Sequence, residues 1–191
     1  MKFNKSQIWS LVFLIVVAAV YRIIPGRAPG FAPQIAMAIF AGAVIKDRKW
    51  AFAFPVFSMF ISDLLFQILY KTGVSATAGF YEGQLENYIL FALLVFIGMT
   101  IKKLKIFNIL AASLAAPAVY FLLSNFMVWA SSGVTRGLDR PRTFSGLLMC
   151  YSDGLPFFRT SIIATLVFSG ILFGSYYLVT RSRLNSQLAV D

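Results

Sequence analysis

The stretch from Gly30 to Leu65 constrains the fold of this chain more than any other stretch. Two apolar segments are joined there by the short sequence KDRKW (46–50), in which three of the residues are basic. Two membrane helices joined by a tight cytoplasmic hairpin have this pattern, because lysine and arginine are retained on the cytoplasmic side of a membrane. The stretch therefore predicts a helical hairpin within a lipid bilayer.

Composition extends this interpretation to the whole chain. The 191 residues are 59% hydrophobic and have a mean hydropathy of +0.79. Long apolar runs with few charges are typical of polytopic membrane proteins and leave no room for a separate large soluble domain. The net charge of +10 would suggest a nucleic-acid partner in a soluble protein. In a membrane protein the basic loops account for it, so we expect lipid and no nucleic acid as partner.

The residue types also limit the chemistry. The chain has no histidine, and its single cysteine is Cys150, which excludes a Cys/His zinc site and an intrachain disulfide. The carboxylates are scattered and form no recognisable acid–base pair. No P-loop is present, so any ATP-driven step would need a partner. We therefore expect no enzyme activity, no metal and no cofactor.

The hydropathy pattern predicts an all-α fold in which six transmembrane helices form one integral membrane domain over residues 1–191. The expected helices span approximately residues 8–24, 32–45, 51–70, 87–101, 106–130 and 157–180. Six spans place both termini on one side, together with the Lys-rich connections at 46–49 and 102–105. That side carries the larger share of basic residues, which predicts a bacterial cytoplasmic (inner) membrane protein with both termini in the cytoplasm.

Asp63 lies deep within the third expected helix, on one face with Met59 and Gln67. A carboxylate in hydrocarbon costs roughly several kcal/mol, so we expect Asp63 to face the bundle interior and to have a polar partner. Two interpretations stay open: a structural tie to a neighbouring helix or to an arginine, and a ligand site. Arg22, at the end of the first helix, is expected to extend toward the membrane interface.

The segment from Ser131 to Leu155 is predicted to be the longest connection, and long connections often form lids or binding loops. We expect this loop to fold over the outer helix ends and roof a cavity, because water is a poor environment for its apolar centre, 144–151. Trp129 would stack there on a ligand, Asn125 would supply hydrogen bonds, and Arg159 would attract an anionic group. The alternative is that Trp129 and Arg159 are interfacial anchors. The candidate substrate-binding residues are Asp63, Asn125, Trp129, Tyr151 and Arg159.

Pairs of small residues four positions apart give faces for close helix contact. They occur at Ala32/Ala36, at Ala38/Gly42 and, as a GxxxG pair, at Gly170/Gly174. Such a pair packs either inside the bundle or against a partner helix.

These motifs also carry a resemblance that spans most of the chain. The stretch Ala38–Gly42, the pair Ser62–Asp63, the stretch Asn125–Trp129, and Cys150–Tyr151 with Pro156–Phe158 follow in a characteristic order, preceded by a looser match at 27–31. In these features the chain resembles the substrate-binding S components of energy-coupling factor (ECF) vitamin transporters. It is more closely similar to an uncharacterised bacterial membrane family assigned to transport.

The resemblance implies six helices and an outward-facing pocket for a vitamin or cofactor precursor. It also implies docking on a transmembrane coupling protein driven by ATPases, with Ala32/Ala36 or Ala38/Gly42 as the contact. It names no solute, and it leaves open whether the chain uses a coupling module or acts alone. We therefore expect a substrate-binding transport subunit for a small solute at the outer face. The alternative is a structural or assembly subunit that does not transport.

Overall fold

The computed structural model describes residues 5–24, 26–131 and 140–188, and their side chains over 12–24, 26–131 and 140–181. Within these ranges the chain is all-helical, as predicted. The helices are α1 (Lys5–Arg22), α2 (Gln34–Val44), α3 (Arg48–Lys71), α4 (Gln84–Met99), α5 (Ile106–Ala130) and α6 (Phe144–Leu188). The second to fifth helices lie close to their expected bounds, because their apolar runs are ended by charged or glycine-rich segments.

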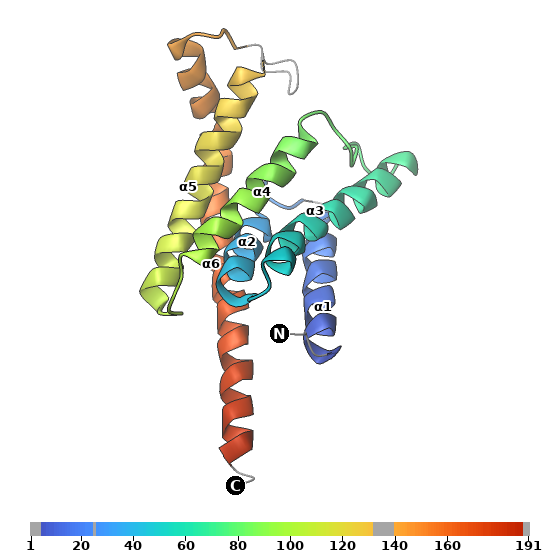
Figure 1. Cartoon of the computed structure of the whole chain (residues 1–191). Coiled ribbons are helices and arrows are strands. Elements are labelled where there is room, and N and C mark those ends of the chain that lie inside the picture. The colour runs from blue at the N-terminus through green and yellow to red at the C-terminus, as the bar shows by residue number, and fades with distance from the viewer. Residues whose placement is uncertain (1–4, 25, 132–139, 189–191) are drawn as a thin grey trace.

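The short helix α2 forms the centre of the bundle. All residues from Gln34 to Ala41 are buried, and α2 contacts α3, α4, α5 and α6 (Figure 1). The closest approach is to α4, where a Cβ added to Gly98 would collide with the Ile39 carbonyl and one added to Gly42 would collide with the Val95 carbonyl. Glycine at both positions therefore allows the two backbones to touch.

This packing favours one of the two interpretations of the small-residue pairs. Ala36 and Ala38 are completely buried within the chain, and Gly42 is used against α4, so the face they form is not open to a partner helix. Gly170 and Gly174 differ, because both are exposed and a Cβ added to either would meet open space. Their role in helix packing stays a prediction, and it would concern a partner rather than this bundle.

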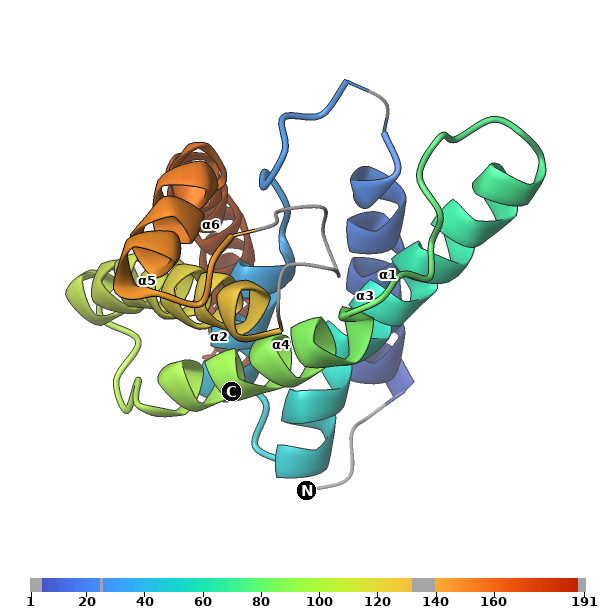
Figure 2. The same cartoon turned by 90° about the horizontal axis from the view of Figure 1, so that it is seen from above.

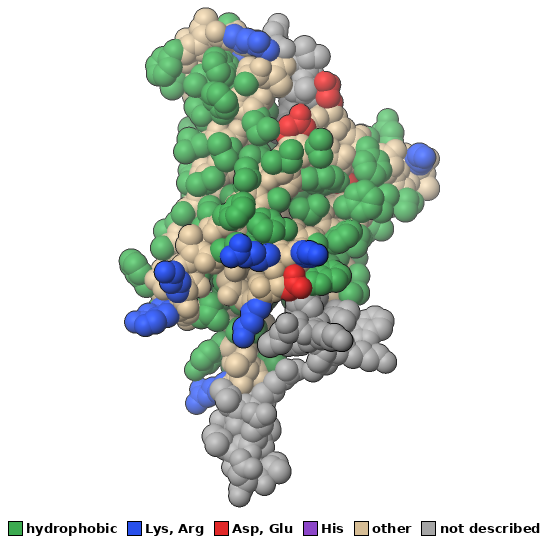
Figure 3. All heavy atoms as spheres, in the orientation of Figure 1, with side chains coloured by type: hydrophobic (Ala, Val, Ile, Leu, Met, Phe, Trp, Pro, Cys, Tyr) green, Lys and Arg blue, Asp and Glu red, His purple; other side chains and the backbone are tan. Residues whose placement is uncertain are grey.

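The exterior is apolar around the middle of the molecule, and the space-filling view shows basic side chains gathered mainly in a band below it (Figure 3). Large exposed side chains include Phe57, Phe96, Leu122 and Ile171. Three helical segments are long and apolar enough to cross a membrane: Arg48–Lys71, Ile106–Ala130 and Phe144–Arg181. Shorter apolar helices are Val12–Arg22, Gln34–Val44 and Gln84–Met99. Such an exterior associates with lipid, since water is a poor environment for it.

The connections sort to two ends of the bundle. Figure 1 shows the α2–α3 and α4–α5 connections at one end, on the side where α1 begins and toward which α6 runs. The α1–α2 and α3–α4 connections lie at the opposite end. Helix α6 has 45 residues, about 67 Å at 1.5 Å per residue, and its last turns extend beyond the other helices. The two Lys-rich hairpins therefore share one end of the molecule.

The predicted start of the sixth helix was wrong. Helix α6 begins at Phe144 and continues through Pro156, so the segment 144–155 is helical and not a roofing loop. Gly154 allows this, because its missing side chain leaves room for the Asn125 side chain, whose Oδ1 would lie 2.6 Å from an added Cβ. Helix α5 thus packs directly against the first turns of α6, and this contact outweighs the break that Pro156 makes in the helical hydrogen bonds. Residues 132–139 lie outside the described residues.

Candidate functional site

Asp63 is the centre of a buried polar network between three helices. Its side chain is 1% exposed, and Oδ1 accepts a hydrogen bond from Arg22 Nη1 at 2.8 Å. Its other oxygen, Oδ2, accepts from Gln84 Nε2 at 2.6 Å and from the Tyr88 hydroxyl at 2.7 Å. The prediction that Asp63 faces the interior and has a polar partner is confirmed, and the ion pair supports the structural interpretation of this residue.

Arg22 does not extend toward the interface as expected. It turns into the bundle, where Nη1 also donates to Ser62 Oγ at 3.0 Å and the guanidinium lies 5.8 Å from the centre of the Phe66 ring. The carboxylate of Asp63 explains this orientation, because a charge-assisted hydrogen bond in a dry interior is stronger than one at a wet surface. Helices α1, α3 and α4 are thereby tied together at one level.

Two polar side chains close to this network have buried atoms without hydrogen-bond partners. Both side-chain atoms of Gln34, Nε2 and Oε1, are unpaired although the residue is 2% exposed. The Nε of Arg27 is likewise buried and unpaired, while its Nη1 donates to the Phe31 carbonyl at 2.6 Å. Nearly all buried polar groups in proteins have a partner, so these atoms are candidates for hydrogen bonds to water or to a ligand.

The α1–α2 connection holds these residues over one end of the bundle. Phe31 packs between Tyr21 of α1 and Phe168 of α6, with ring centres 6.4 and 5.7 Å apart. Ser161 Oγ of α6 donates to the Gly30 carbonyl at 3.2 Å, and Gly30 has a φ of +81°, which favours glycine. Figure 2 shows this connection crossing from α1 to α2. The α1–α2 connection therefore lies over this end. Of the segment 131–155 that was expected to roof a cavity, residues 144–155 belong to α6 and residues 132–139 lie outside the described residues.

The helix register places Gln34 at the level of the Asp63 network. Helices α2 and α3 are antiparallel neighbours, and Ser58 Oγ lies 3.6 Å from Met37 Sδ. One turn further along each helix toward the covered end brings Gln34 beside Ser62, which accepts the hydrogen bond from Arg22. Side chains in a helix point back toward its N-terminus, so the Gln34 amide extends toward the covering connection.

The charge in this region is not balanced. Two guanidinium groups, of Arg22 and Arg27, lie near a single carboxylate, that of Asp63, and the structure records no ion pair for Arg27 within the described residues. Burial lowers the pKa of Arg27 from its usual value, and the nearby positive charge of Arg22 lowers it further. The N-terminus of α2 adds partial positive charge from its unpaired N–H groups.

The other candidate binding residues lie between α5 and α6 and make contacts within the chain. Trp129 Nε1 donates to the Pro141 carbonyl at 3.1 Å, Tyr151 donates to the Leu122 carbonyl at 3.2 Å, and Asn125 Nδ2 donates to the Phe121 carbonyl at 2.8 Å. Arg159 is exposed on α6. These four residues share the α5–α6 pair, but Asp63 belongs to the separate network of α1, α3 and α4. Whether any of them binds a solute stays a prediction.

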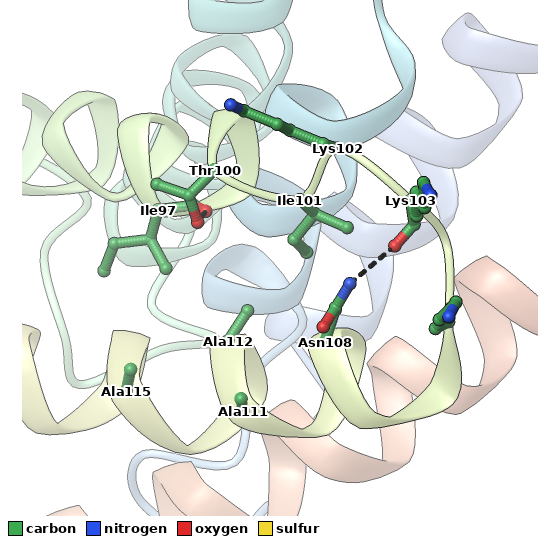
Figure 4. A pocket seen from close by; sticks show the side chains of 10 residues that line it. Ile97, Thr100, Ile101, Lys102, Lys103, Asn108, Ala111, Ala112 and Ala115 are labelled. Carbon is green, nitrogen blue, oxygen red and sulfur yellow. Dashed lines mark hydrogen bonds between the residues drawn. The ribbon is translucent and has the colours of Figure 1, made fainter.

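A second polar feature lies at the opposite end, between the end of α4 and the start of α5 (Figure 4). A hollow of about 590 Å³ is lined there by the three lysines of the hairpin and by small or aliphatic side chains of the two helices. Asn108 Nδ2 donates to the Lys103 carbonyl at 2.9 Å and fixes the turn. The lysines are exposed, whereas Arg22 of the Asp63 network is only 16% exposed and forms a salt bridge.

Metal chemistry finds no support in the part of the chain that the structure describes. No group of three or more His, Cys, Asp or Glu side chains that could hold a metal ion occurs there. Cys150 is buried and unpaired, on the α6 segment that packs against α5.

Sequence reasoning missed Arg27, Gln34, Gln84 and Tyr88 as members of a polar site. One signal could have found Gln34, which is the polar residue at the start of an otherwise apolar helix and directly follows Pro33. For Gln84 and Tyr88, their i, i+4 spacing places both on one face of α4. Nothing local indicated that this face would meet Asp63.

Together, the apolar exterior and the buried ion pair define an all-helical protein of the membrane-associated class. The chain belongs to the DUF6580 family, described as a family of unknown function, whose model matches residues 2–188. No curated protein matches the chain, and no solved structure matches it.

Proposed function

We propose that this protein crosses the bacterial cytoplasmic membrane six times and binds a small anionic solute as a subunit of a transport system. In this proposal the Lys-rich hairpins and both termini are cytoplasmic, because lysine is retained on that side. The solute site lies at the opposite end, between the α1–α2 connection and the Asp63 network. It includes Arg27 and Gln34 and replaces the expected site around Asn125 and Trp129.

The unpaired amide of Gln34 is the observation that carries the proposal. Burying an amide without partners costs about 1–3 kcal/mol, and Gln34 is 2% exposed with neither atom bonded. A leucine would fill similar space without this cost. A solute that accepts from Nε2 and donates to Oε1 explains why an amide stands here.

The charge balance indicates the chemical class of the solute. The guanidinium of Arg27 and the N-terminus of α2 both favour an anion, and Arg22 is already neutralised by Asp63. A carboxylate or a phosphate group suits this arrangement. The resemblance to ECF S components supports a vitamin or cofactor precursor as the solute, and ATP hydrolysis would be supplied by partner subunits.

A structural or assembly subunit is the second candidate, and one observation favours it. The GxxxG pair Gly170/Gly174 lies on an exposed face of α6 with open space around it. A partner helix could approach closely there. In that case the chain would stabilise a complex without binding a solute.

The proposal is tested by identifying small molecules that leave the purified protein. The protein is purified from its native membrane in mild detergent, denatured, and the released compounds are measured by mass spectrometry. We expect one anionic compound, near one equivalent per chain, from the natural protein. It should be absent from Gln34→Leu and from Arg27→Gln, because each substitution removes a group assigned to the solute.

Arg159→Gln provides the matched control, since it removes an exposed arginine outside the site. We expect it to retain the compound. Release of the same compound from Gln34→Leu and Arg27→Gln would contradict the proposed site. Loss from Arg159→Gln alone would return the site to α5 and α6. No retained compound in any sample, together with a stable complex that Gly170→Leu disrupts, would support the assembly role instead.

A further inference from the structure

The hollow at the α4–α5 hairpin combines two kinds of surface. Its outer part carries Lys102, Lys103 and Lys105, and no acidic residue lines it. Its inner part is formed by Ile97 of α4, by Ile101 of the hairpin and by three alanines of α5. The hollow is thus cationic at the hairpin and aliphatic along α5 (Figure 4).

The hairpin places positive charge at the outer part of the hollow. Lys105 N donates to the Lys103 carbonyl at 2.8 Å, so the turn between the helices is tight. Lys105 is also the N-cap residue of α5, and no side chain caps this helix end. The first N–H groups of α5 therefore add to the field of the three ammonium groups.

The alanines give the inner part its shape. Ala111 and Ala115 are four residues apart on an exposed face of α5, with Ala112 buried beside them. These three short side chains form the α5 wall of the hollow, which we call its alanine channel. Ile97 forms its other wall from α4. An extended hydrocarbon chain fits such a channel, whereas a soluble phosphate ion makes no use of it.

The position of the hollow in the molecule also suits a ligand with an anionic headgroup and a hydrocarbon chain. The α2–α3 and α4–α5 hairpins lie at one end of the bundle (Figure 1), where basic side chains form a band below the apolar surface (Figure 3). Lipid headgroups meet a membrane protein at such a boundary, and basic pockets between helices at this level favour anionic headgroups.

We propose that this hollow binds one anionic glycerophospholipid. Its phosphate contacts the ammonium groups of Lys103 and Lys105 and the N-terminus of α5, and one acyl chain lies along Ala111 and Ala115. Because the solute site is at the other end of the bundle, this lipid site does not depend on the proposed transport function.

The test measures lipid retention by native mass spectrometry. The full chain is reconstituted in nanodiscs of phosphatidylglycerol and phosphatidylcholine in equal amounts and then released into the gas phase. We expect one phosphatidylglycerol to remain bound in preference to phosphatidylcholine. The triple variant Lys102→Gln, Lys103→Gln, Lys105→Gln should retain it roughly 100-fold less strongly, because each lysine near an anionic surface contributes about a factor of five.

Two further variants separate the site from general surface charge. Lys46→Gln, Arg48→Gln, Lys49→Gln changes the charge by the same amount at the other hairpin, where all three residues are exposed, and should retain the lipid. Ala115→Phe keeps every lysine but fills the channel, and should lose the lipid. Far-ultraviolet circular dichroism checks that each variant is helical.

Four results would overturn the proposal. Three of them are equal retention by the two triple variants, unchanged retention by Ala115→Phe, and, third, displacement of the lipid by millimolar inorganic phosphate alone. The third result would mean that the hollow recognises a free phosphate. Equal retention of phosphatidylcholine and phosphatidylglycerol would exclude a role for the lysines in selecting the headgroup, and would equally contradict it.

Discussion

The two ends of the bundle treat charge in opposite ways. At the covered end, Asp63 is 1% exposed and bonded to three different side chains. At the other end, Lys102, Lys103 and Lys105 are exposed around an open hollow. A buried charge requires a defined partner at a defined distance, because the interior offers no water to replace it. Exposed lysines need no such partner and act together through their field.

This difference explains why the two ends tolerate change differently. Removing Arg22 or Asp63 from the Asp63 network leaves the other charge in the bundle without its counter-charge. Removing one lysine of the hairpin only weakens a field to which several groups contribute. The four predictions below test this comparison, in order of decreasing effect.

The largest expected effect is the difference in chemical labelling between the two ends, because we expect them on opposite sides of the membrane. In a Cys150→Ser background, single cysteines are placed at Lys103 and at Glu82, which is exposed in the α3–α4 connection. In intact cells a membrane-impermeant maleimide should label position 82 and leave position 103 unlabelled, because the Lys-rich end is expected in the cytoplasm. Labelling of position 103 from outside would reverse the topology.

Breaking the buried pair should have the largest effect on stability. Asp63→Asn leaves the Arg22 guanidinium without a counter-charge, and loss of one partner of a buried pair costs about 3–5 kcal/mol. The free energy of unfolding in mixed micelles measures this loss. The double variant Arg22→Gln, Asp63→Asn removes both charges and should recover more than half of it. A loss of less than about 1 kcal/mol for Asp63→Asn would mean that the pair contributes little.

Backbone contact at the centre of the bundle gives a smaller effect. Gly98→Ala places a methyl group against the Ile39 carbonyl, and overpacking of this kind costs about 1–3 kcal/mol. Gly170→Ala is the matched control, because the same methyl group meets open space there. It should leave the isolated chain unchanged or slightly more stable, since alanine favours a helix more than glycine does.

The same pair of variants sharpens the choice between the two candidate functions. If a partner helix packs on Gly170, the Gly170→Ala variant should release that partner on affinity purification although the chain itself stays stable. Equal destabilisation of the isolated chain by both glycine variants would contradict the packing described for α2 and α4.

The smallest effect is expected for the exposed ion pair. Arg140 donates two hydrogen bonds to one oxygen of Asp153, at 3.0 and 2.8 Å, but the two side chains are 29% and 34% exposed. Such a pair contributes less than about 1 kcal/mol. Asp153→Asn should therefore change the free energy of unfolding far less than Asp63→Asn. A comparable loss for both would mean that burial does not decide the strength of these pairs.

Much of the fold could be predicted because it depends on local features. The apolar runs and their charged ends place α2 to α5 nearly as observed, and the cost of a carboxylate in hydrocarbon predicts that Asp63 has a partner. The start of α6 could not be predicted in this way. Gly154 and Pro156 favour a loop locally, and only contact with Asn125 of α5 shows why the helix continues through them.

The candidate site was less predictable than the fold. Trp129, Asn125 and Tyr151 are residue types typical of a binding site, but in the structure each hydrogen-bonds a backbone carbonyl within the chain. Gln34 and Arg27 were not predicted as members of a site, because their unpaired atoms become visible only when every neighbour is in place. An unsatisfied group is a property of the surroundings and not of the residue.

The sequence by itself determined the helical class, the apolar exterior, the grouping of lysines at two hairpins and the need for a partner at Asp63. These follow from hydropathy and charge, which each residue carries wherever it lies. The tertiary structure alone decided that this partner is Arg22, 41 residues away. It also decided that α2 is enclosed by its neighbours and that the Gln34 side chain is buried without a hydrogen-bond partner. These depend on which surfaces meet, and hydrogen bonds and close packing act only over a few ångströms.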